Sequence, residues 1–195
     1  MTDMTPSKLL NCSTSAFGIG HLLHVLDYEH KDEHDADAIW LFDTIIPPFQ
    51  RQVVWNEAMM SRFITSIWQG VDIGRYIVND IMDNPSPTDG RIWHKEDHWL
   101  IDGQQRLTAI DRYVRDKIAI QGEDGRLWLW SDLSKSDHRK FGHIGFPRGI
   151  VRMGSEYDLR VLYDTMNFGG MAHTQEQRAL PEGIPENWEP SRTCP

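Results

Sequence analysis

The chain has 195 residues, of which 39% are hydrophobic, and its 29 acidic against 20 basic residues give a formal charge of −9. This length and composition predict a single folded domain, and the acidic balance excludes a surface that is basic all over and built to neutralise nucleic-acid phosphates. Because the two cysteines exclude a disulfide framework and no apolar stretch is long enough for a membrane span, we expect a cytoplasmic protein, in a bacterium or a phage-infected cell.

Composition divides the chain into three parts. Seven acidic residues and one lysine lie between Asp27 and Asp43, so residues 1–44 are predicted to form an acidic N-terminal arm. Residues 45–180 alternate apolar segments with Gly and Pro turns, which is typical of a packed domain. The last fifteen residues, 181–195, contain four prolines and predict an extended tail.

The predicted elements follow one another from residue 56 onward. Asn56 is an N-cap for a helix that ends at Gly70, and apolar residues at helical spacing form its buried face. Strands are expected over residues 73–78 and 99–102, a helix from Gln104, and a further strand over residues 127–130. Ser155 opens a helix whose apolar face is Leu159, Leu162, Tyr163 and Met166. Residues 84–90 and 142–149 are expected to be loops, and Thr174 and Gln177 have the spacing of a capping box.

The segment from Leu100 to Thr108 carries the clearest chemistry. It places Asp102, Gly103 and Arg106 where a strand ends and a helix begins. Free N–H groups at a helix start bind anions, a glycine lets a phosphate approach the backbone, and a guanidinium matches phosphate oxygens. Asp102 can hold a divalent cation or accept a proton. The alternative is structural, with Asp102 capping the helix and Arg106 pairing with it.

Two further segments each have a structural explanation as well as a functional one. Residues 46–51 form a Pro-fixed arm in which Gln50 and Arg51 either line a site or face water, while Phe49 and Trp55 anchor the arm. Residues 167–170, which begin with Asn167, are explained by a glycine turn at a helix end.

Taken together and in this order, the three segments resemble a known family. The blocks Ile46 to Trp55, Ile101 to Thr108 and Asn167 to Arg178 follow the pattern of the GmrS-like family, the N-terminal domain of GmrSD-type modification-dependent restriction systems, within the ParB/sulfiredoxin superfamily. The resemblance spans about residues 45–180. It implies an α/β (α+β) fold, a small mixed sheet flanked by helices, with a nucleotide site at the helix that begins near Gly103.

The resemblance also implies roles for residues of these blocks. Catalysis falls to Asp102, Arg106 and Gln105, and a metal ion would be held by Asp102. Nucleotide binding falls to Gln50, Arg51, Gly103, Gln104 and Asn167. Because no cysteine lies in the phosphate-binding segment, sulfiredoxin chemistry is disfavoured. At this length we also expect the chain to lack the helical C-terminal part and the His-Asn-His nuclease domain of longer relatives.

The function that this implies is phosphoryl transfer from a nucleoside triphosphate, ATP or GTP, with Mg²⁺, by hydrolysis or by kinase-type transfer in DNA modification or restriction. A phage or mobile-element origin fits a compact member of this kind. The alternative is a non-catalytic nucleotide sensor that docks on DNA and regulates a partner nuclease. Nuclease activity is the third and weakest reading.

Three side-chain groups outside these blocks each have a functional and a structural explanation. A basic patch of Lys135, Arg139, Lys140, Arg148 and Arg152 would meet DNA, unless it is a solvated loop with chance charge. A metal site is suggested by the spacing of His21, His24, His30 and His34, which equally fits a solvated arm. The tryptophans at 68, 128 and 130 are expected to pack the core, with an exposed aromatic able to stack on a base.

Overall fold

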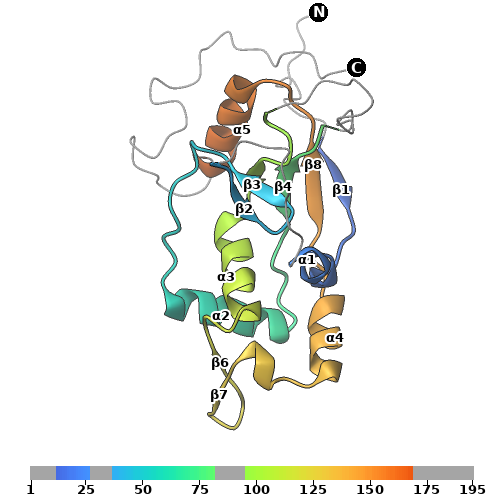
Figure 1. Cartoon of the computed structure of the whole chain (residues 1–195), viewed down its shortest axis with the longest axis vertical. Helices are drawn as coiled ribbons and strands as arrows, with labels where there is room; N and C mark the ends of the chain where they lie inside the picture. Colours follow the sequence, from blue (N-terminus) through green and yellow to red (C-terminus); the bar gives the residue numbers. More distant parts are fainter. Residues whose placement is uncertain (1–11, 27–36, 82–94, 169–195) are drawn as a thin grey trace, which may run out of the picture.

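The computed structural model describes residues 12–26, 37–81 and 95–168 (Figure 1). The elements before residue 80 are β1 (Ser13–Ser15), α1 (Ile19–Val25), β2 (Ile39–Leu41), β3 (Thr44–Ile46), α2 (Glu57–Trp68) and β4 (Tyr76–Asn79). The elements after it are β5 (Leu100–Asp102), α3 (Gln104–Val114), β6 (Ile120–Gln121), β7 (Leu127–Trp128), the 3₁₀ turn η1 (Trp130–Asp132), α4 (Lys135–His143), β8 (Arg148–Val151) and α5 (Glu156–Phe168).

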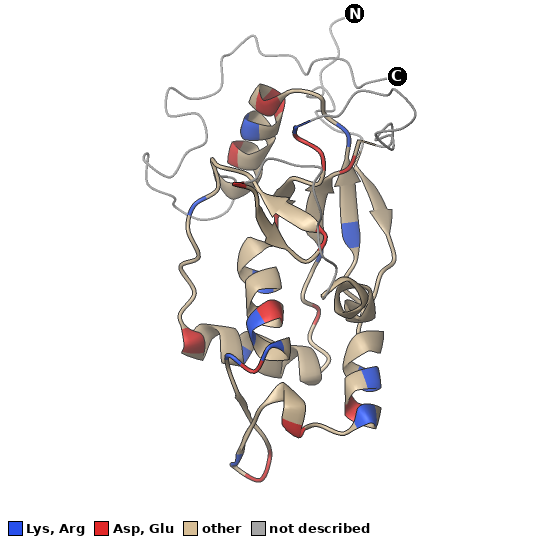
Figure 2. Cartoon of the chain, in the orientation of Figure 1, with Lys and Arg blue, Asp and Glu red and all other residues tan. Residues whose placement is uncertain are grey.

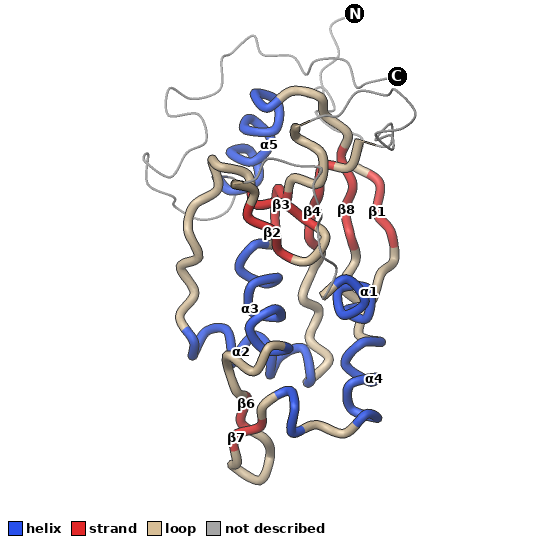
Figure 3. The backbone as a smooth tube through the Cα atoms, in the orientation of Figure 1, coloured by secondary structure: helices blue, strands red, loops and turns tan. Residues whose placement is uncertain are grey.

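A four-stranded sheet in the order β1-β8-β4-β5 forms the centre of the fold (Figure 3). Strands β8 and β4 pair in parallel, whereas β1 and β5 pair antiparallel with their neighbours. Two short hairpins, β2-β3 and β6-β7, lie outside this sheet. The mixed sheet with its helices confirms the expected α/β class, while the closer likeness to the ParB/sulfiredoxin topology stays a prediction.

The sheet separates two hydrophobic cores, because alternate residues of a strand point to opposite faces. Tyr76, Val78 and Leu100 belong to the larger core, to which helices α1 to α4 contribute. Ile77 and Ile101 point the other way and pack under α5 in the smaller core. Among the described helices, α5 packs on one face of the sheet, and α1 to α4 gather on the opposite face (Figure 1).

Three helices begin where the sequence predicts. The Asn56 side chain accepts a hydrogen bond of 2.9 Å from the Met59 N–H and so caps α2, which is followed by a left-handed Gly70 with φ +76°. Helix α3 begins at Gln104 directly after β5, and α5 begins one residue after Ser155.

Two predicted strands are shorter than expected because local side chains close turns. Residues before Tyr76 do not join β4, because Asp72 accepts a hydrogen bond from the Gly74 N–H and Gly74 is left-handed at φ +71°. Strand β7 ends at Trp128, because Asp132 accepts a 2.9 Å hydrogen bond from the Leu129 N–H and holds η1 together.

The predicted loop over residues 142–149 is shorter than expected, because residues 144–147 connect α4 to β8 and the two ends of the range belong to these elements. Gly142 lies in α4 and Gly149 lies in β8, where each is packed against a neighbouring element. A Cβ atom on Gly142 would stand 3.4 Å from the Gly20 Cα atom, and one on Gly149 would stand 3.0 Å from the Ile77 side chain. These glycines serve close packing rather than chain reversal.

Part of the segment expected to form an acidic arm is packed into the fold. Strand β1 pairs with β8, and α1 contacts α4 and buries Ile19 and Leu22 in the larger core. The acidic stretch 27–36, the expected loop at 84–90, the Thr174 turn and the tail lie outside the described residues. Among the helices that are described, none has the length and apolar character of a membrane span.

Gly103 joins β5 to α3 in a left-handed conformation, with φ +107°. A Cβ atom there would lie 2.6 Å from the Tyr76 Cβ and 3.2 Å from its Cα, and Tyr76 is fully buried. A side chain at this position would therefore strain the backbone and would also clash with the tightly packed Tyr76.

We expect Gly103→Ala to lower the free energy of unfolding by about 3 kcal/mol, from left-handed strain and from overpacking against Tyr76. Gly70→Ala is the matched control, because Gly70 is also left-handed but has nothing within 4 Å of the added atom. The control should lose only the strain, about 1 kcal/mol. Urea unfolding of both variants measures the difference, and equal losses would show that contact with Tyr76 has no cost.

Candidate functional site

The β5-α3 junction places polar groups around the start of a helix. Asp102 is the last residue of β5, and Gly103 makes the left-handed turn and, as a glycine, has no side chain with which to cap the first N–H groups of α3. Uncapped N–H groups at a helix start, at the positive end of the helix dipole, are suited to an anion. The strand, glycine turn and helix that the sequence predicts here are therefore present, and phosphate binding at them stays a prediction.

Asp102 and Arg106 form an ion pair across the first turn of α3. Arg106 Nη2 lies 2.6 Å from Asp102 Oδ2, and Arg106 Nη1 donates a hydrogen bond of 2.9 Å to the Ile73 carbonyl. The Asp102 side chain remains 35% exposed and the Arg106 side chain 21%. The pairing named as the structural alternative is thus present, at a place where both groups still reach solvent.

Gln105 binds the chain that connects the Pro-fixed arm (residues 46–51) to α2, and so holds it at the start of α3. Its Oε1 accepts hydrogen bonds from the Val54 N–H at 3.0 Å and the Trp55 N–H at 3.1 Å. Two backbone donors fix which end of the amide is the oxygen. The opposite Nε2 atom is buried and has no hydrogen-bond partner within the described segments. The Nε2 atom of Gln105 is therefore a hydrogen-bond donor, in the first turn of α3, that has no partner among the described residues.

The arm is anchored by the side chains of Phe49 and Gln50. Gln50 Nε2 donates a hydrogen bond to the Leu100 carbonyl, so its amide binds the edge of β5. The Phe49 ring packs edge-on against Trp99 at 5.7 Å and Tyr163 at 5.5 Å between centroids. Anchoring by Phe49 agrees with the structural explanation of this segment.

Tyr163, Arg51 and Asp102 are brought together between the arm, β5 and α5. Burial raises the pKa of Tyr163 above its usual range, and the charges of Asp164 and, to a smaller extent, Asp102 add to the rise. The Arg51 main-chain hydrogen bond and the Arg51 charge oppose it. The sequence assigned Tyr163 only to the apolar face of its helix. Its helical spacing gave no sign that its hydroxyl meets these groups.

The two remaining predicted site residues take structural positions. Gln104 is only 9% exposed at the start of α3. Asn167 donates a hydrogen bond of 2.8 Å to the Tyr163 carbonyl one turn earlier in α5. The predicted residues Asp102, Gly103, Gln104, Gln105 and Arg106 therefore follow one another at the β5-α3 junction, with Gln50 and Arg51 on the adjoining arm, whereas Asn167 lies in α5.

Arg148 does not lie on the surface that the sequence predicted for DNA. It is 6% exposed, with Nη1 2.6 Å from Asp43 Oδ2 and Nη2 3.5 Å from Asp80 Oδ2. His21 Nε2 stands 3.5 Å from the same Asp43 oxygen. Arg148 pairs with the buried Tyr76 across the parallel strands β4 and β8, so its guanidinium is buried as well. The carboxylates of Asp43 and Asp80 offset the cost of burying this charge.

The rest of the predicted basic patch also divides. Arg152 is half-buried, and its Nε atom is inaccessible to solvent. Lys135, Arg139 and Lys140 are exposed along α4 (Figure 2). These residues form one group when charge is counted along the sequence. In the structure, β8 and α4 place them in different surroundings, so they do not form one surface.

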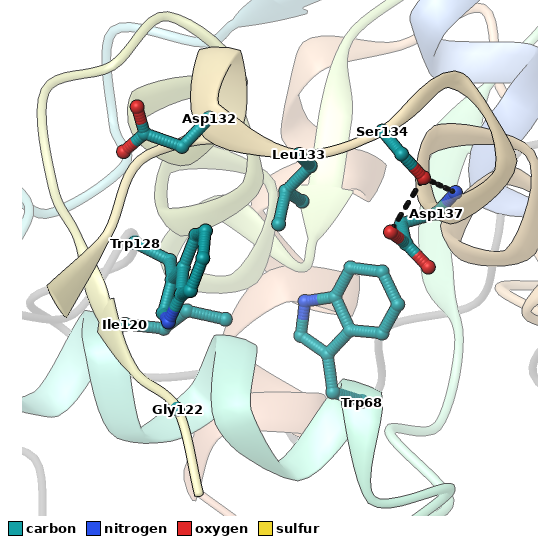
Figure 4. A pocket seen from close by; sticks show the side chains of 8 residues that line it. All are labelled: Trp68, Ile120, Gly122, Trp128, Asp132, Leu133, Ser134 and Asp137. Atoms are coloured by element: carbon teal, nitrogen blue, oxygen red, sulfur yellow. Dashed lines mark hydrogen bonds between the residues drawn. The ribbon is translucent and has the colours of Figure 1, made fainter. Parts of the chain in front are cut away.

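A cavity of about 440 Å³ lies between α2, the β6-β7 hairpin and the chain that leads from η1 into α4 (Figure 4). Trp68, Trp128 and Leu133 form apolar walls, and Ser134 and Asp137 stand at one side. Hydrogen bonds from Ser134 and Lys140 hold the pKa of the Asp137 carboxyl below its usual range. Neither this cavity nor the second one, between α1 and α4, is lined by residues of the β5-α3 junction.

The histidines near the N-terminus that the structure describes do not form a metal site. No cluster of three metal-ligating side chains occurs within them, and His30 and His34 lie outside. His21 instead contacts Asp43, and His24 is exposed in the last turn of α1.

Comparison with known families gives one match. A family model described as "GmrSD restriction endonuclease, N-terminal domain" matches residues 29–145, which is more than half of the chain. The matched stretch contains the arm and the β5-α3 junction, and it ends before β8 and α5. No curated protein and no solved structure matches the chain.

The Gln105 contacts predict a measurable loosening of the arm. Gln105→Leu removes the acceptor for two backbone N–H groups, so hydrogen exchange at Val54 and Trp55 should accelerate and stability should fall by about 1–3 kcal/mol. Gln121→Leu removes an exposed glutamine that bonds only the Gly125 carbonyl and should leave both amides protected. Unchanged exchange at Val54 and Trp55 in Gln105→Leu would contradict the clamp.

Proposed function

The chain belongs to the GmrSD restriction endonuclease N-terminal domain family and so to DNA restriction, and within that role we propose that it transfers phosphoryl groups from a nucleoside triphosphate. The proposed site is the β5-α3 junction, with ATP or GTP as donor. Water or a nucleotide or DNA hydroxyl is the acceptor. Such a reaction belongs in the cytoplasm of a bacterium or a phage-infected cell, where nucleoside triphosphates are available.

The observation that carries the proposal is the set of hydrogen-bond donors in the first turn of α3. The N-cap residue Gly103 has no side chain to cap the first N–H groups of the helix, and Gln105 Nε2 is a buried donor without a partner among the described residues. A buried donor left unpaired costs about 1–3 kcal/mol. A phosphate oxygen would satisfy it, and the Gly103 turn exposes the neighbouring backbone to the same oxygen group.

Each charged residue has a role in this proposal. Arg106 is oriented by the Ile73 carbonyl and would neutralise phosphate charge, with Arg51 on the arm as a second cation. The Asp102 carboxylate would orient the acceptor hydroxyl or take its proton. Gln50 and Gln104 position the arm and the first turn of the helix.

Asp102 is the proposed ligand of a magnesium ion at this site. Mg²⁺ is commonly held by one or two carboxylates together with the phosphates of a nucleotide and several waters, and it does not need a complete protein cage. Asp102 supplies one partly exposed carboxylate, and Mg²⁺ bound there would supply charge neutralisation for the transferred group.

One observation favours a non-catalytic alternative. Asp102 and Arg106 already neutralise each other at 2.6 Å, as a pair would that opens only when a nucleotide arrives. Under this alternative the chain senses a nucleotide and regulates a partner nuclease. The two functions differ in whether multiple turnover occurs, so a kinetic measurement separates them.

Asp102→Asn should lower phosphate release or transfer by about 100-fold or more while nucleotide binding persists, because the amide keeps the size of the carboxylate but cannot take a proton. Asp111→Asn is the control, since Asp111 forms the same kind of pair with Arg115 farther along α3. Release from ATP and GTP, with and without Mg²⁺ and DNA, is measured beside a binding titration.

Two results would overturn the catalytic role. Wild-type turnover that survives Asp102→Asn would remove Asp102 from the reaction. Absence of wild-type turnover under every condition, with intact nucleotide binding, would leave the sensor as the function of the site.

A further inference from the structure

A second cleft lies between α1 and α4, away from the β5-α3 junction. Its volume is about 480 Å³, and its walls include Leu23, His24, His138, Arg139 and His143. His24, Arg139 and His143 are exposed. The cleft therefore gathers imidazoles and a guanidinium from two helices that are more than a hundred residues apart in sequence.

Glycines at the helix crossing allow the cleft to form. A Cβ atom on Gly18 would stand 2.7 Å from the Gly142 carbonyl oxygen, and one on Gly20 would stand 3.1 Å from the same oxygen. The backbones of the two helices therefore meet directly, and the larger side chains around the crossing become the walls of the cleft. Leu23 contributes an apolar side chain to these walls.

The cleft is free of acidic lining within the described part of the chain. Helix α1 carries no carboxylate, and the one acidic residue of α4 is Asp137, which pairs with Lys140 at 2.9 Å. His138 is held in place by a hydrogen bond between its Nε2 and the Trp130 carbonyl and by stacking on the Trp130 ring at 4.1 Å. The polar groups of this surface are thus suited to an acceptor-rich anion.

The spacing along α4 favours an extended anion over a single phosphate. Lys135, Arg139 and His143 recur every four residues and so follow one face of the helix. Eight residues of α-helix span about 12 Å, which is the axial rise of three to four nucleotides in one DNA strand. One nucleotide would occupy only part of this row.

We propose that the α1-α4 cleft docks the phosphate backbone of DNA, with Arg139 as its central contact and His24 and His143 on either side. The choice of DNA rests on the role in restriction given above, but the docking does not require catalysis at Asp102. The surface differs from the patch that the sequence predicted: Arg148 and Arg152 are replaced by residues of α1.

The test is Arg139→Gln in the full chain, with binding of a fluorescently labelled 20-base-pair DNA followed by anisotropy at several salt concentrations. Removing one phosphate contact should weaken binding several-fold at every concentration and lower the slope of log affinity against log salt by about one. Arg139→Lys should restore most of the affinity, because it restores the charge.

Arg62→Gln is the matched control, because Arg62 is an exposed arginine on α2 and its loss lowers the net charge equally. DNA affinity in this variant should equal that of the wild type. Equal affinity of Arg139→Gln and wild type, or equal loss in both glutamine variants, would overturn the proposal. Wild-type protein that does not bind DNA would overturn it as well.

Nucleotide binding measured in parallel keeps the two sites distinct. Arg139→Gln should bind ATP and release phosphate as the wild type does in the absence of DNA. If ATP affinity falls together with DNA affinity, the cleft is a nucleotide-phosphate site and the DNA proposal fails. If only catalysis at Asp102 fails its own test, the docking result is unaffected.

Discussion

The close approach of Gly103 to Tyr76 determines how the candidate site is built. Because Gly103 is left-handed and has no side chain, β5 can end in close contact with Tyr76 of β4, and α3 can begin at the next residue, Gln104. That geometry places Asp102, Gln105 and Arg106 on one turn, close to the residues that precede β4. The arm, the ion pair and the uncapped N–H groups all depend on this single change of direction.

Several polar side chains of the site have a structural partner as well as a possible ligand. Gln105 uses its oxygen for the arm and keeps its Nε2 donor, while Arg106 uses one nitrogen for the Ile73 carbonyl and another for Asp102. Groups fixed in this way lose little freedom when a ligand arrives, which is how a preorganised site limits the entropy cost of binding. The same contacts explain why a structural interpretation and a functional one fit the same residues.

The sequence predicted local features well and long-range placement poorly. The Asn56 cap and the helix starts at Gln104 and after Ser155 follow from nearby residues, so they were predictable. The burial of Arg148 was not, because it depends on Asp43 more than a hundred residues earlier and on which strand becomes central. The hydroxyl of Tyr163 was missed for a related reason, since helical periodicity reports the buried face of a residue and not what its polar end meets.

The position of β8 has a consequence for synthesis and for truncation. Strand β8 lies between β1 and β4, yet it comes last among the strands of the sheet and outside the stretch that matches the family model. A nascent chain must therefore hold β1 and the β4-β5 pair apart until β8 leaves the ribosome, which makes folding depend on non-local pairing. A fragment cut at the boundary of the match would leave β4 with an open edge, available to strands of other molecules.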